Sequence, residues 1–252
     1  MADVPEFVNG TADLSVAGYQ LRIEMEVPTG RKRPIHLLPL FHSVANALVE
    51  VAETMVAEQG RTISCKKGCG ACCRQLVPVS PSEARRLREL VDALPEPRRS
   101  EIRSRFADAR ARLEQAGMLE RLADPRRFAD TSSTLAIEYF RHGIACPFLE
   151  QESCSIHEDR PLACREYLVT SAAEHCSQPT AETVRCVKMP AEASSALLQL
   201  EPASADYAAR WVTLALALDW ANEHPDLVPE RPGPELVRDF FDKLSGQKLA
   251  SS

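Results

Sequence analysis

The sequence predicts a mainly α fold with a short N-terminal β element. Several segments place apolar residues at helical spacing, whereas only one stretch near the N-terminus alternates with the period of a strand. There is no internal repeat and no alternation of strands with helices, which argues against an α/β architecture. The 252 residues are 44% hydrophobic and 26% charged, with a net charge of −6, so the chain can bury a substantial core.

Residues 1–60 form the first predicted unit, made of a β element and a long helix. Within 11–30, charged residues separate the apolar ones of an alternating stretch, Leu21, Ile23, Met25 and Val27. This pattern is typical of a half-buried strand, and Pro28-Thr29-Gly30 ends it. From Ile35 to about Gln59 the apolar residues recur every three or four positions, which predicts an amphipathic helix that stops at Gly60.

A helical hairpin is predicted between 82 and 117. Ser80-Pro81-Ser82-Glu83 has the form of a capping box with proline at the first helical position. A second helix follows Pro97, and Gly117 is placed to end it. Its apolar stripe consists of Ile102, Phe106, Ala109 and Leu113. A further short helix is predicted over residues 134–142.

The C-terminal part, 191–252, is expected to form helices that pack on the same core. A helix is predicted over 203–222, around Tyr207, Trp211, Leu214, Ala215 and Leu218. Gly233-Pro234 opens a last amphipathic segment, which Gly246 closes. The stretch from Ser177 to Pro202, rich in Ala, Ser, Thr, Glu and Pro, predicts only local packing of Val184 to Met189.

Several features indicate a cytoplasmic protein that binds neither membrane nor nucleic acid. Residues 1–10 have neither the basic stretch nor the apolar run of a signal peptide, and no apolar run approaches the roughly 18 residues of a membrane span. The arginines of residues 83–130 resemble a nucleic-acid patch, but these twelve Arg accompany ten Asp or Glu. An ion-paired, solvated helix surface is the better interpretation.

Nine cysteines are the most informative feature of the chain. Because the cytosol keeps thiols reduced, metal binding or redox chemistry explains them better than a disulfide framework. Four of them lie within nine residues, in Cys65-Lys-Lys-Gly-Cys69-Gly-Ala-Cys72-Cys73, where small residues let the backbone wrap closely around an ion. Thiolates are soft ligands that select zinc, copper(I) or iron–sulfur clusters. Lys66, Lys67 and Arg74 could offset the charge of these thiolates.

A second group of cysteines complements the first. Cys146, Cys154 and Cys164 follow with seven and nine residues between them, and eleven residues separate Cys164 from Cys176. The helices between 82 and 142 can fold as an excursion that returns the chain to the first group. Residues 61–190 are therefore expected to form a cysteine-cluster domain with an inserted helical hairpin, so that the helical fold is organised around a cysteine-rich metal site.

These residues resemble the YkgJ-type cysteine-cluster family, described as zinc- or iron-chelating domains with a CxxCxxCC-like core. The resemblance covers about 65–176. It is carried by Gly68-Cys69-Gly70-Ala71-Cys72-Cys73, Cys146-Pro147-Phe148-Leu149, Cys154-Ser155-Ile156-His157 and Arg160-Pro161-Leu162-Ala163-Cys164-Arg165-Glu166-Tyr167. It implies about eight metal-associated cysteines acting as one unit: Cys65, Cys69, Cys72, Cys73, Cys146, Cys154, Cys164 and Cys176. Cys186 is the alternative to Cys176 as the eighth metal-associated cysteine. His157 stands where the family usually has tyrosine, so we expect an exposed histidine at a helix start.

The other polar residues of the motif have structural explanations. Pro161 can set the first turn of a helix that delivers Cys164, while Arg160 and Arg165 can bind backbone oxygens or balance thiolate charge. Substrate binding is the alternative for the arginines. His175 is expected to be incidental, and the neighbouring acids are expected at the surface or behind the ligands: Glu150, Glu152, Glu158, Asp159 and Glu166.

The identity of the metal stays open between zinc and iron, including an iron–sulfur cluster. The spacing from Cys65 to Cys72 is that of radical S-adenosylmethionine enzymes, but Ala71 occupies the position of their usual aromatic residue and no barrel repeats follow. An iron–sulfur cluster on another fold is compatible with the thiols, and a related cysteine-rich region occurs in flagellin lysine methylases. Structural zinc would tie the two blocks together without redox chemistry.

Two functions follow from these observations. The first is a metal-binding protein whose site is structural or handles metal. The second is a metal- or iron–sulfur-dependent oxidoreductase or protein-modifying enzyme. The sequence offers no glycine-rich nucleotide loop after a strand and no paired histidines at helical spacing, so no catalytic residues are assigned. The metal ion is the only partner that the sequence indicates.

Overall fold

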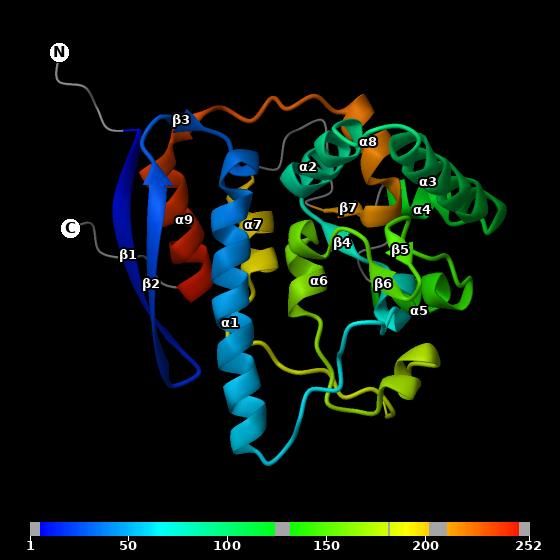
Figure 1. The fold of residues 1–252 in the computed structure, drawn as a ribbon, viewed down its shortest axis with the longest axis horizontal. Coiled ribbons are helices and arrows are strands. Elements are labelled where there is room, and N and C mark those ends of the chain that lie inside the picture. Colours follow the sequence, from blue (N-terminus) through cyan, green and yellow to red (C-terminus); the bar gives the residue numbers. More distant parts are fainter. Residues whose placement is uncertain (1–5, 124–131, 181, 202–210, 247–252) are drawn as a thin grey trace.

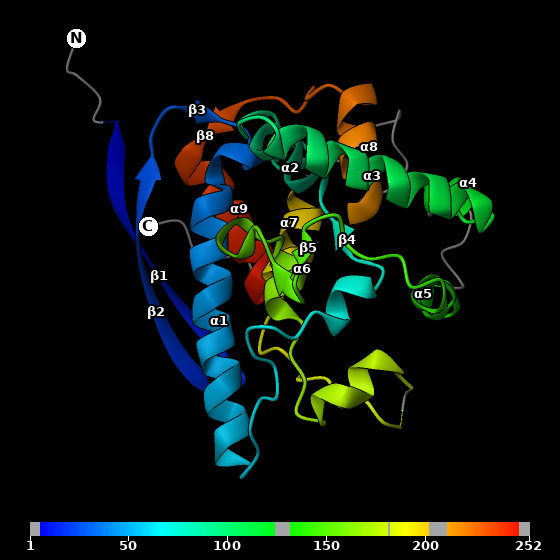
Figure 2. The same ribbon diagram turned by 45° about the vertical axis from the view of Figure 1, so that its right-hand side comes forward.

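A computed structural model describes residues 6–123, 132–180, 182–201 and 211–246. The described chain is mainly helical, as the sequence predicts. A β-hairpin of β1 (Phe7–Val16) and β2 (Tyr19–Pro28) stands on one side of the long helix α1 (Leu38–Glu58). The helices between residues 81 and 166 lie on its other side, whereas the last helix, Gly233–Ser245, contacts the hairpin (Figures 1 and 2).

The N-terminal β element is a complete antiparallel hairpin. Its register runs from Phe7 opposite Pro28 to Val16 opposite Tyr19, and Ala17 and Gly18 make the turn with positive φ angles of 51° and 88°. The predicted strand is β2. The sequence reading missed β1, whose inward positions include Gly10 and small Ala12 and therefore give a weak strand signal.

Helix α1 confirms the amphipathic pattern predicted between Ile35 and Gln59. A 3₁₀ turn, η1 (Pro34–Leu37), leads into it, and the helix itself ends at Glu58. Its buried face is formed by Leu38, Phe41, Val44, Ala45, Leu48, Ala52 and Val56.

Together, η1 and α1 give one helical stretch, Pro34–Glu58, that is long and apolar enough to cross a membrane by length and composition. The sequence predicted this helix, but no membrane span was expected. Core helices of soluble proteins pass the same test, and here Phe41, Val44 and Leu48 are fully buried inside the protein. The buried face therefore accounts for the apolar composition.

The predicted helical hairpin is present as α2 (Pro81–Asp92) and α3 (Arg98–Gln115), which contact each other. Its capping box forms as predicted: Ser80 Oγ accepts a hydrogen bond from Glu83 N at 3.1 Å, and Glu83 Oε2 accepts one from Ser80 N at 2.7 Å. The short helices α4 (Leu119–Ala123) and α5 (Ser132–Arg141) follow.

The prediction of a helix over 203–222 is wrong for Val212–Thr213, near the start of the described part of that range. Residues 202–210, including Tyr207, lie outside the described residues. Val212–Thr213 form a short strand, β7, that pairs with β4 (Pro78–Val79), since β-branched residues favour this pairing over a helix. A 3₁₀ turn, η6 (Leu214–Leu216), then leads into the helix α8 (Ala217–Glu223).

The C-terminal region contributes two helices that lie together. Helix α9 (Gly233–Ser245) confirms the last predicted segment and ends at Gly246 with a φ of 67°. Helix α7 (Ala193–Leu200), which contacts α9, was missed by the sequence reading. Gly233 cannot carry a side chain, because a Cβ there would lie 1.9 Å from the backbone oxygen of Pro28 at the end of β2. Next to it, β3 (Arg31–Lys32) pairs with β8 (Arg231–Pro232).

The apolar core consists of three clusters. The first apolar cluster joins the hairpin, α1, α7 and α9, and contains the stacked rings of Phe41 and Phe240, whose centroids are 4.0 Å apart. The second apolar cluster joins α2, α3, Phe148 and the segment from β7 to α8. A third extends it from α3 to α4 and α5. The division of the chain at residues 60 and 190 stays a prediction.

Candidate metal centre

The first cysteine block is a series of tight turns. Gly68 has a φ of 86°, and Cys69 N donates to Lys66 O at 3.1 Å. A 3₁₀ turn, η2 (Ala71–Arg74), carries Cys72 and Cys73. Successive residues of a 3₁₀ helix differ by about 120° around its axis, so these two side chains leave the backbone in different directions.

The second block presents its cysteines on one loop and three short elements. Cys146 precedes β5 (Leu149–Glu150), and Cys154 ends β6 (Ser153–Cys154), the partner strand of β5. The remaining two cysteines lie on α6 (Leu162–Glu166), which carries Cys164, and on the 3₁₀ turn η5 (Ala173–Ser177), which carries Cys176. Pro161 is the residue directly before α6, close to its predicted place in the first turn.

Direct contacts join the two blocks. Cys146 N donates a 2.7 Å hydrogen bond to Cys73 O. Arg74 donates two hydrogen bonds to Glu152, from Nη1 to Oε2 at 2.9 Å and from Nη2 to Oε1 at 2.6 Å. Its Nη1 also donates to Gly70 O at 3.0 Å. At Gly70 an added Cβ would lie 2.6 Å from Leu149 Cδ1 and 2.7 Å from Glu152 Oε2. The glycine therefore lets the first block approach the β5–β6 turn closely.

The segment after α6 completes the arrangement. Ser64 N donates to Val169 O at 2.9 Å, and Val169 N donates to the sulfur of Cys65 at 3.4 Å. On its other side Val169 forms a β-bridge with Cys186. Cys176 is buried at 4% exposure, whereas Cys186 is exposed. η5, which carries Cys176, contacts η2.

The thiols of Cys72 and Cys73 are hydrogen-bonded to each other. A hydrogen bond from the thiol of Cys73 lowers the pKa of Cys72 to about 7, aided by the positive charge of Arg160. The same bond, with burial, raises the pKa of Cys73 well above its ordinary value. The lowered pKa favours the thiolate form of Cys72, which is the form that binds a metal.

Burial keeps most of the other thiols protonated. It raises the pKa of Cys146 to about 12 and the pKa of Cys164 well above its ordinary value. It also raises the pKa values of Cys65, Cys154 and Cys176. A bound cation would reverse this effect, so metal uptake at these thiols would release protons.

Electrostatic interactions link thiols of the two blocks. Cys72 acts on the thiols of Cys65, Cys73, Cys146, Cys154, Cys164 and Cys176, and Cys69 acts on Cys65 and Cys176. Within the part of the chain that the structure describes, however, no three Cys, His, Asp or Glu side chains converge closely enough to hold a metal ion. The ligand set therefore stays a prediction. The donors suit a thiophilic metal, because thiolates are soft ligands. A cysteine sulfur can also move between staggered χ1 positions while the backbone stays in place.

The arginines beside the cysteines have distinct roles. Arg165, 5% exposed, joins α6 to α1 through a 3.0 Å bond from Nη1 to Asn46 Oδ1, and its Nε donates to Arg160 O at 3.0 Å. Arg160 contacts His157 at 2.9 Å through Nη1, but its buried Nε finds no partner among the described residues. Its charge lowers the pKa of Cys72, and it acts in the same direction on Cys65 and Cys154.

Both histidines of the motif are exposed. His157 is exposed at the start of a 3₁₀ turn, η4 (His157–Asp159), as expected. His175 is also exposed, and its Nδ1 lies 3.1 Å from Thr183 O.

Glu83 is a site residue whose second contact sequence reasoning missed. Its Oε1 accepts a 2.8 Å hydrogen bond from Leu162 N, at the start of the helix that carries Cys164. Burial raises the pKa of this carboxyl. The capping-box pattern identified Glu83, but no sequence signal reports a contact across 79 positions.

Comparison with known proteins bears on the same segment. Residues 64–187 match the family model of CxxCxxCC, a putative zinc- or iron-chelating domain. The predicted resemblance over 65–176 is confirmed, and the match extends beyond Cys186. No curated protein and no solved structure matches the chain.

Proposed function

Taking residues 64–187 as a CxxCxxCC-type domain, we propose that the protein binds zinc or iron through thiolates of both cysteine blocks. The proposed ligands are Cys65, Cys69, Cys72, Cys73, Cys146, Cys154, Cys164 and Cys176. The metal would tie together two segments that the helices α2 to α5 separate along the chain. Its role would be structural or metal-handling.

The observation that carries this proposal is the hydrogen bond from Cys146 N to Cys73 O. Its length of 2.7 Å brings the first cysteine of the second block directly against the last cysteine of the first. A disulfide framework or scattered core cysteines would not require backbone contact at this position. The juxtaposition puts enough thiols in one region for a thiolate metal site.

Zinc and an iron–sulfur cluster both suit these donors, because both are held by cysteine thiolates. Zinc would supply stability without redox chemistry. An iron–sulfur cluster would add electron transfer, with a potential set by its burial and by hydrogen bonds to the sulfurs. The protein's own contribution is the same in either case: it holds the two blocks together and places Arg160 beside the thiols.

Anaerobic purification followed by metal analysis and visible absorption tests the proposal. Stoichiometric zinc in a colourless protein excludes the cluster, and a brown protein with iron and acid-labile sulfide excludes zinc. Cys69→Ser should lose metal, whereas unchanged metal content in that variant would contradict the proposed site. Cys176→Ser and Cys186→Ser form a matched pair: we expect metal loss only in the first.

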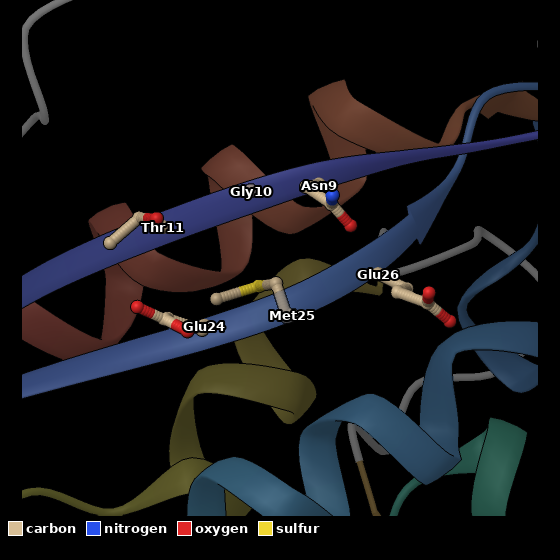
Figure 3. Close-up of a pocket in the computed structure, with 6 residues that line it drawn as sticks. All are labelled: Asn9, Gly10, Thr11, Glu24, Met25 and Glu26. Atoms are coloured by element: carbon tan, nitrogen blue, oxygen red, sulfur yellow. The ribbon is translucent and has the colours of Figure 1, made fainter.

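An enzymatic role has less support. The pocket drawn in Figure 3 is lined by Asn9, Gly10, Thr11, Glu24, Met25 and Glu26. All six belong to β1 and β2, which carry no cysteine. This pocket is therefore not a substrate pocket beside the thiols, and it does not support the oxidoreductase or protein-modifying alternative.

The proposal includes a cytoplasmic location without nucleic-acid binding. All nine cysteines are free thiols, the state that a reducing compartment maintains. The arginines of α3 are engaged by acids: Arg98 and Arg105 pair with Glu150, and Arg103 pairs with Asp92 at 2.6 Å. These pairs support the interpretation of an ion-paired surface.

A further inference from the structure

The short helix α6, which carries Cys164, is fastened to its surroundings by three buried charged residues. These residues are Glu83, Arg165 and Glu166. Their hydrogen bonds join α6 to α2, α1 and α7, so three different helices fix its place. A helix of five residues has too few internal hydrogen bonds to be stable alone, and such contacts therefore decide where α6 lies.

Glu83 makes the contact between α2 and the start of α6. Its Oε1 accepts a 2.8 Å hydrogen bond from Leu162 N, and its Oε2 accepts a 2.7 Å bond from Ser80 N. Because the amides at a helix start have no partner within the helix, one carboxylate satisfies a backbone amide at the start of two helices. Leu162 is the first residue of α6 and lies two positions before Cys164. The carboxylate therefore acts on the backbone that carries the thiol.

Arg165 and Glu166 fix the other sides of α6. Arg165 Nη1 donates to Asn46 Oδ1 of α1 at 3.0 Å, and its Nε donates to Arg160 O at 3.0 Å. Glu166 Oε1 accepts a 3.2 Å bond from Ser194 N of α7, and its Oε2 accepts one from the Ser194 hydroxyl. These bonds hold the helix body, whereas the bond from Glu83 holds the helix start.

Apolar packing adds to the same arrangement. Leu162 belongs to the first apolar cluster, while Cys164 packs against the second. The start of α6 therefore lies between the two clusters. A shift of this helix start would move the Cys164 thiol relative to the cysteines of the first block.

The charge of Glu83 does not help the Cys164 thiol to ionise. The carboxylate raises the pKa of Cys164, in addition to the larger effect of burial. Arg160 has the opposite effect, because its positive charge lowers the pKa of Cys72. Any benefit of Glu83 to metal binding must therefore come from where it places α6. Loss of a geometric role weakens metal binding, whereas loss of the negative charge alone strengthens it.

We propose that Glu83 is a positioning residue of the metal site, which holds the start of α6 so that the Cys164 sulfur meets the metal. The residue acts through Leu162 N and does not bind the metal itself. This inference rests on the proposed function and adds a residue outside the two cysteine blocks that determines metal affinity.

Glu201 provides a matched control. It is also a buried glutamate that accepts a hydrogen bond at the start of α2, from Ser82 N at 2.9 Å. Its Oε2 has no partner among the described residues, so within them its carboxylate makes no bond to α6. A substitution there changes a buried carboxylate without releasing the helix that carries Cys164.

The zinc affinity of the full-length chain, measured by competition with a chelator at a fixed neutral pH, tests the proposal. Glutamine offers one acceptor oxygen where the glutamate offers two. We expect Glu83→Gln to bind zinc about tenfold more weakly than the wild type and Glu201→Gln to bind it as tightly. Cobalt(II) gives a second readout: the visible absorption of thiolate-bound cobalt should change in Glu83→Gln and stay as in the wild type in Glu201→Gln.

A second variant separates reach from charge. Glu83→Asp keeps the negative charge but shortens the side chain, so it should also weaken zinc binding. It decides the question if Glu83→Gln does not fold.

The outcomes separate this inference from the proposed function. Unchanged or tighter zinc binding in the Glu83 variants overturns the positioning role. Equal losses in Glu83→Gln and Glu201→Gln overturn it as well, since they show a general loss of stability. If Cys164→Ser binds zinc like the wild type, Glu83 has no ligand to place, and metal binding by the other thiols survives. A wild type that binds neither zinc nor iron rejects the proposed function itself.

Discussion

Arg74 and Glu152 lie 78 positions apart and form a two-bond ion pair that closes the first cysteine block onto the β5–β6 turn. The pair is partly solvated, with 34% of the arginine side chain and 51% of the glutamate side chain exposed. Its direct energy is therefore small. Its structural effect is larger, because both partners lie close in sequence to cysteines of the proposed metal site.

Neutralising this pair should weaken the junction between the blocks. We expect Arg74→Gln and Glu152→Gln each to lower the free energy of unfolding, with a coupling energy of about 0.5–1 kcal/mol between them. Arg74→Gln should cost more, since it also removes the bond to Gly70 O. Urea unfolding of the two single variants and the double variant measures the coupling, and a value of zero would show that the pair does not hold the blocks.

Gly70→Ala should push the blocks apart. The added Cβ would overlap Leu149 Cδ1 and Glu152 Oε2, so we expect a loss of about 1–3 kcal/mol in unfolding free energy. Gly30→Ala is the matched control, because a Cβ at Gly30 meets nothing within 4 Å and the change should stay within about 0.5 kcal/mol. Equal stability of the two variants would contradict the close approach at Gly70.

Arg160→Gln should lower metal affinity by about tenfold, the effect typical of residues that support ligands from behind. The reason is the loss of the positive charge beside Cys65, Cys72 and Cys154. Competition with a chelator measures the affinity. Arg103→Gln removes an exposed arginine paired with Asp92 and should leave affinity unchanged. Identical affinities in both variants would refute the charge-balancing role.

Glu201 should make stability depend on pH. Burial raises the pKa of its carboxyl to about 7, while the charge of Arg85 opposes this shift and that of Glu83 adds to it. Oε1 accepts a 2.9 Å hydrogen bond from Ser82 N, and Oε2 has no partner among the described residues. The neutral form is thus favoured in the folded state, so its stabilisation is complete below pH 4.5 and is lost as the pH rises through 7.

Glu201→Gln should flatten this profile. Between pH 5 and pH 8 the wild type should lose up to about 3 kcal/mol more unfolding free energy than the variant. The exposed Glu53→Gln serves as the control and should follow the wild-type profile. Parallel wild-type and Glu201→Gln profiles would exclude Glu201 as the titrating group.

Local patterns in the sequence predicted much of the fold. α1, α2 and α9 each combine a regular apolar stripe with a clear start or stop, such as the Ser80 capping box or Gly246. α7 and β1 were missed, since half of the buried positions of α7 are Ala and the inward positions of β1 include Gly10 and Ala12, so their apolar patterns are weak. The helix predicted across Val212–Thr213 was wrong, because pairing with Pro78–Val79 outweighed the helical spacing.

Only part of the candidate site could likewise be predicted from the sequence. Spacing identified the two cysteine blocks, and the family match confirms the resemblance. The contacts that join the blocks could not be predicted, because Arg74 and Glu152 are ordinary surface residues until the fold brings them together. The same is true of Glu83 and Leu162, which meet only when α6 packs beside α2.

The first apolar cluster, as far as the structure describes it, includes no cysteine, whereas the second is in contact with Cys146 and Cys164. Metal removal should therefore act as a local unfolding event. Amide hydrogen exchange in the metal-free protein should rise in β5 and β6 and remain slow in α1 and α9. The hairpin, α1, α7 and α9 would then act as a permanent scaffold, and the cysteine segment as a metal-gated subdomain that orders when its ion arrives.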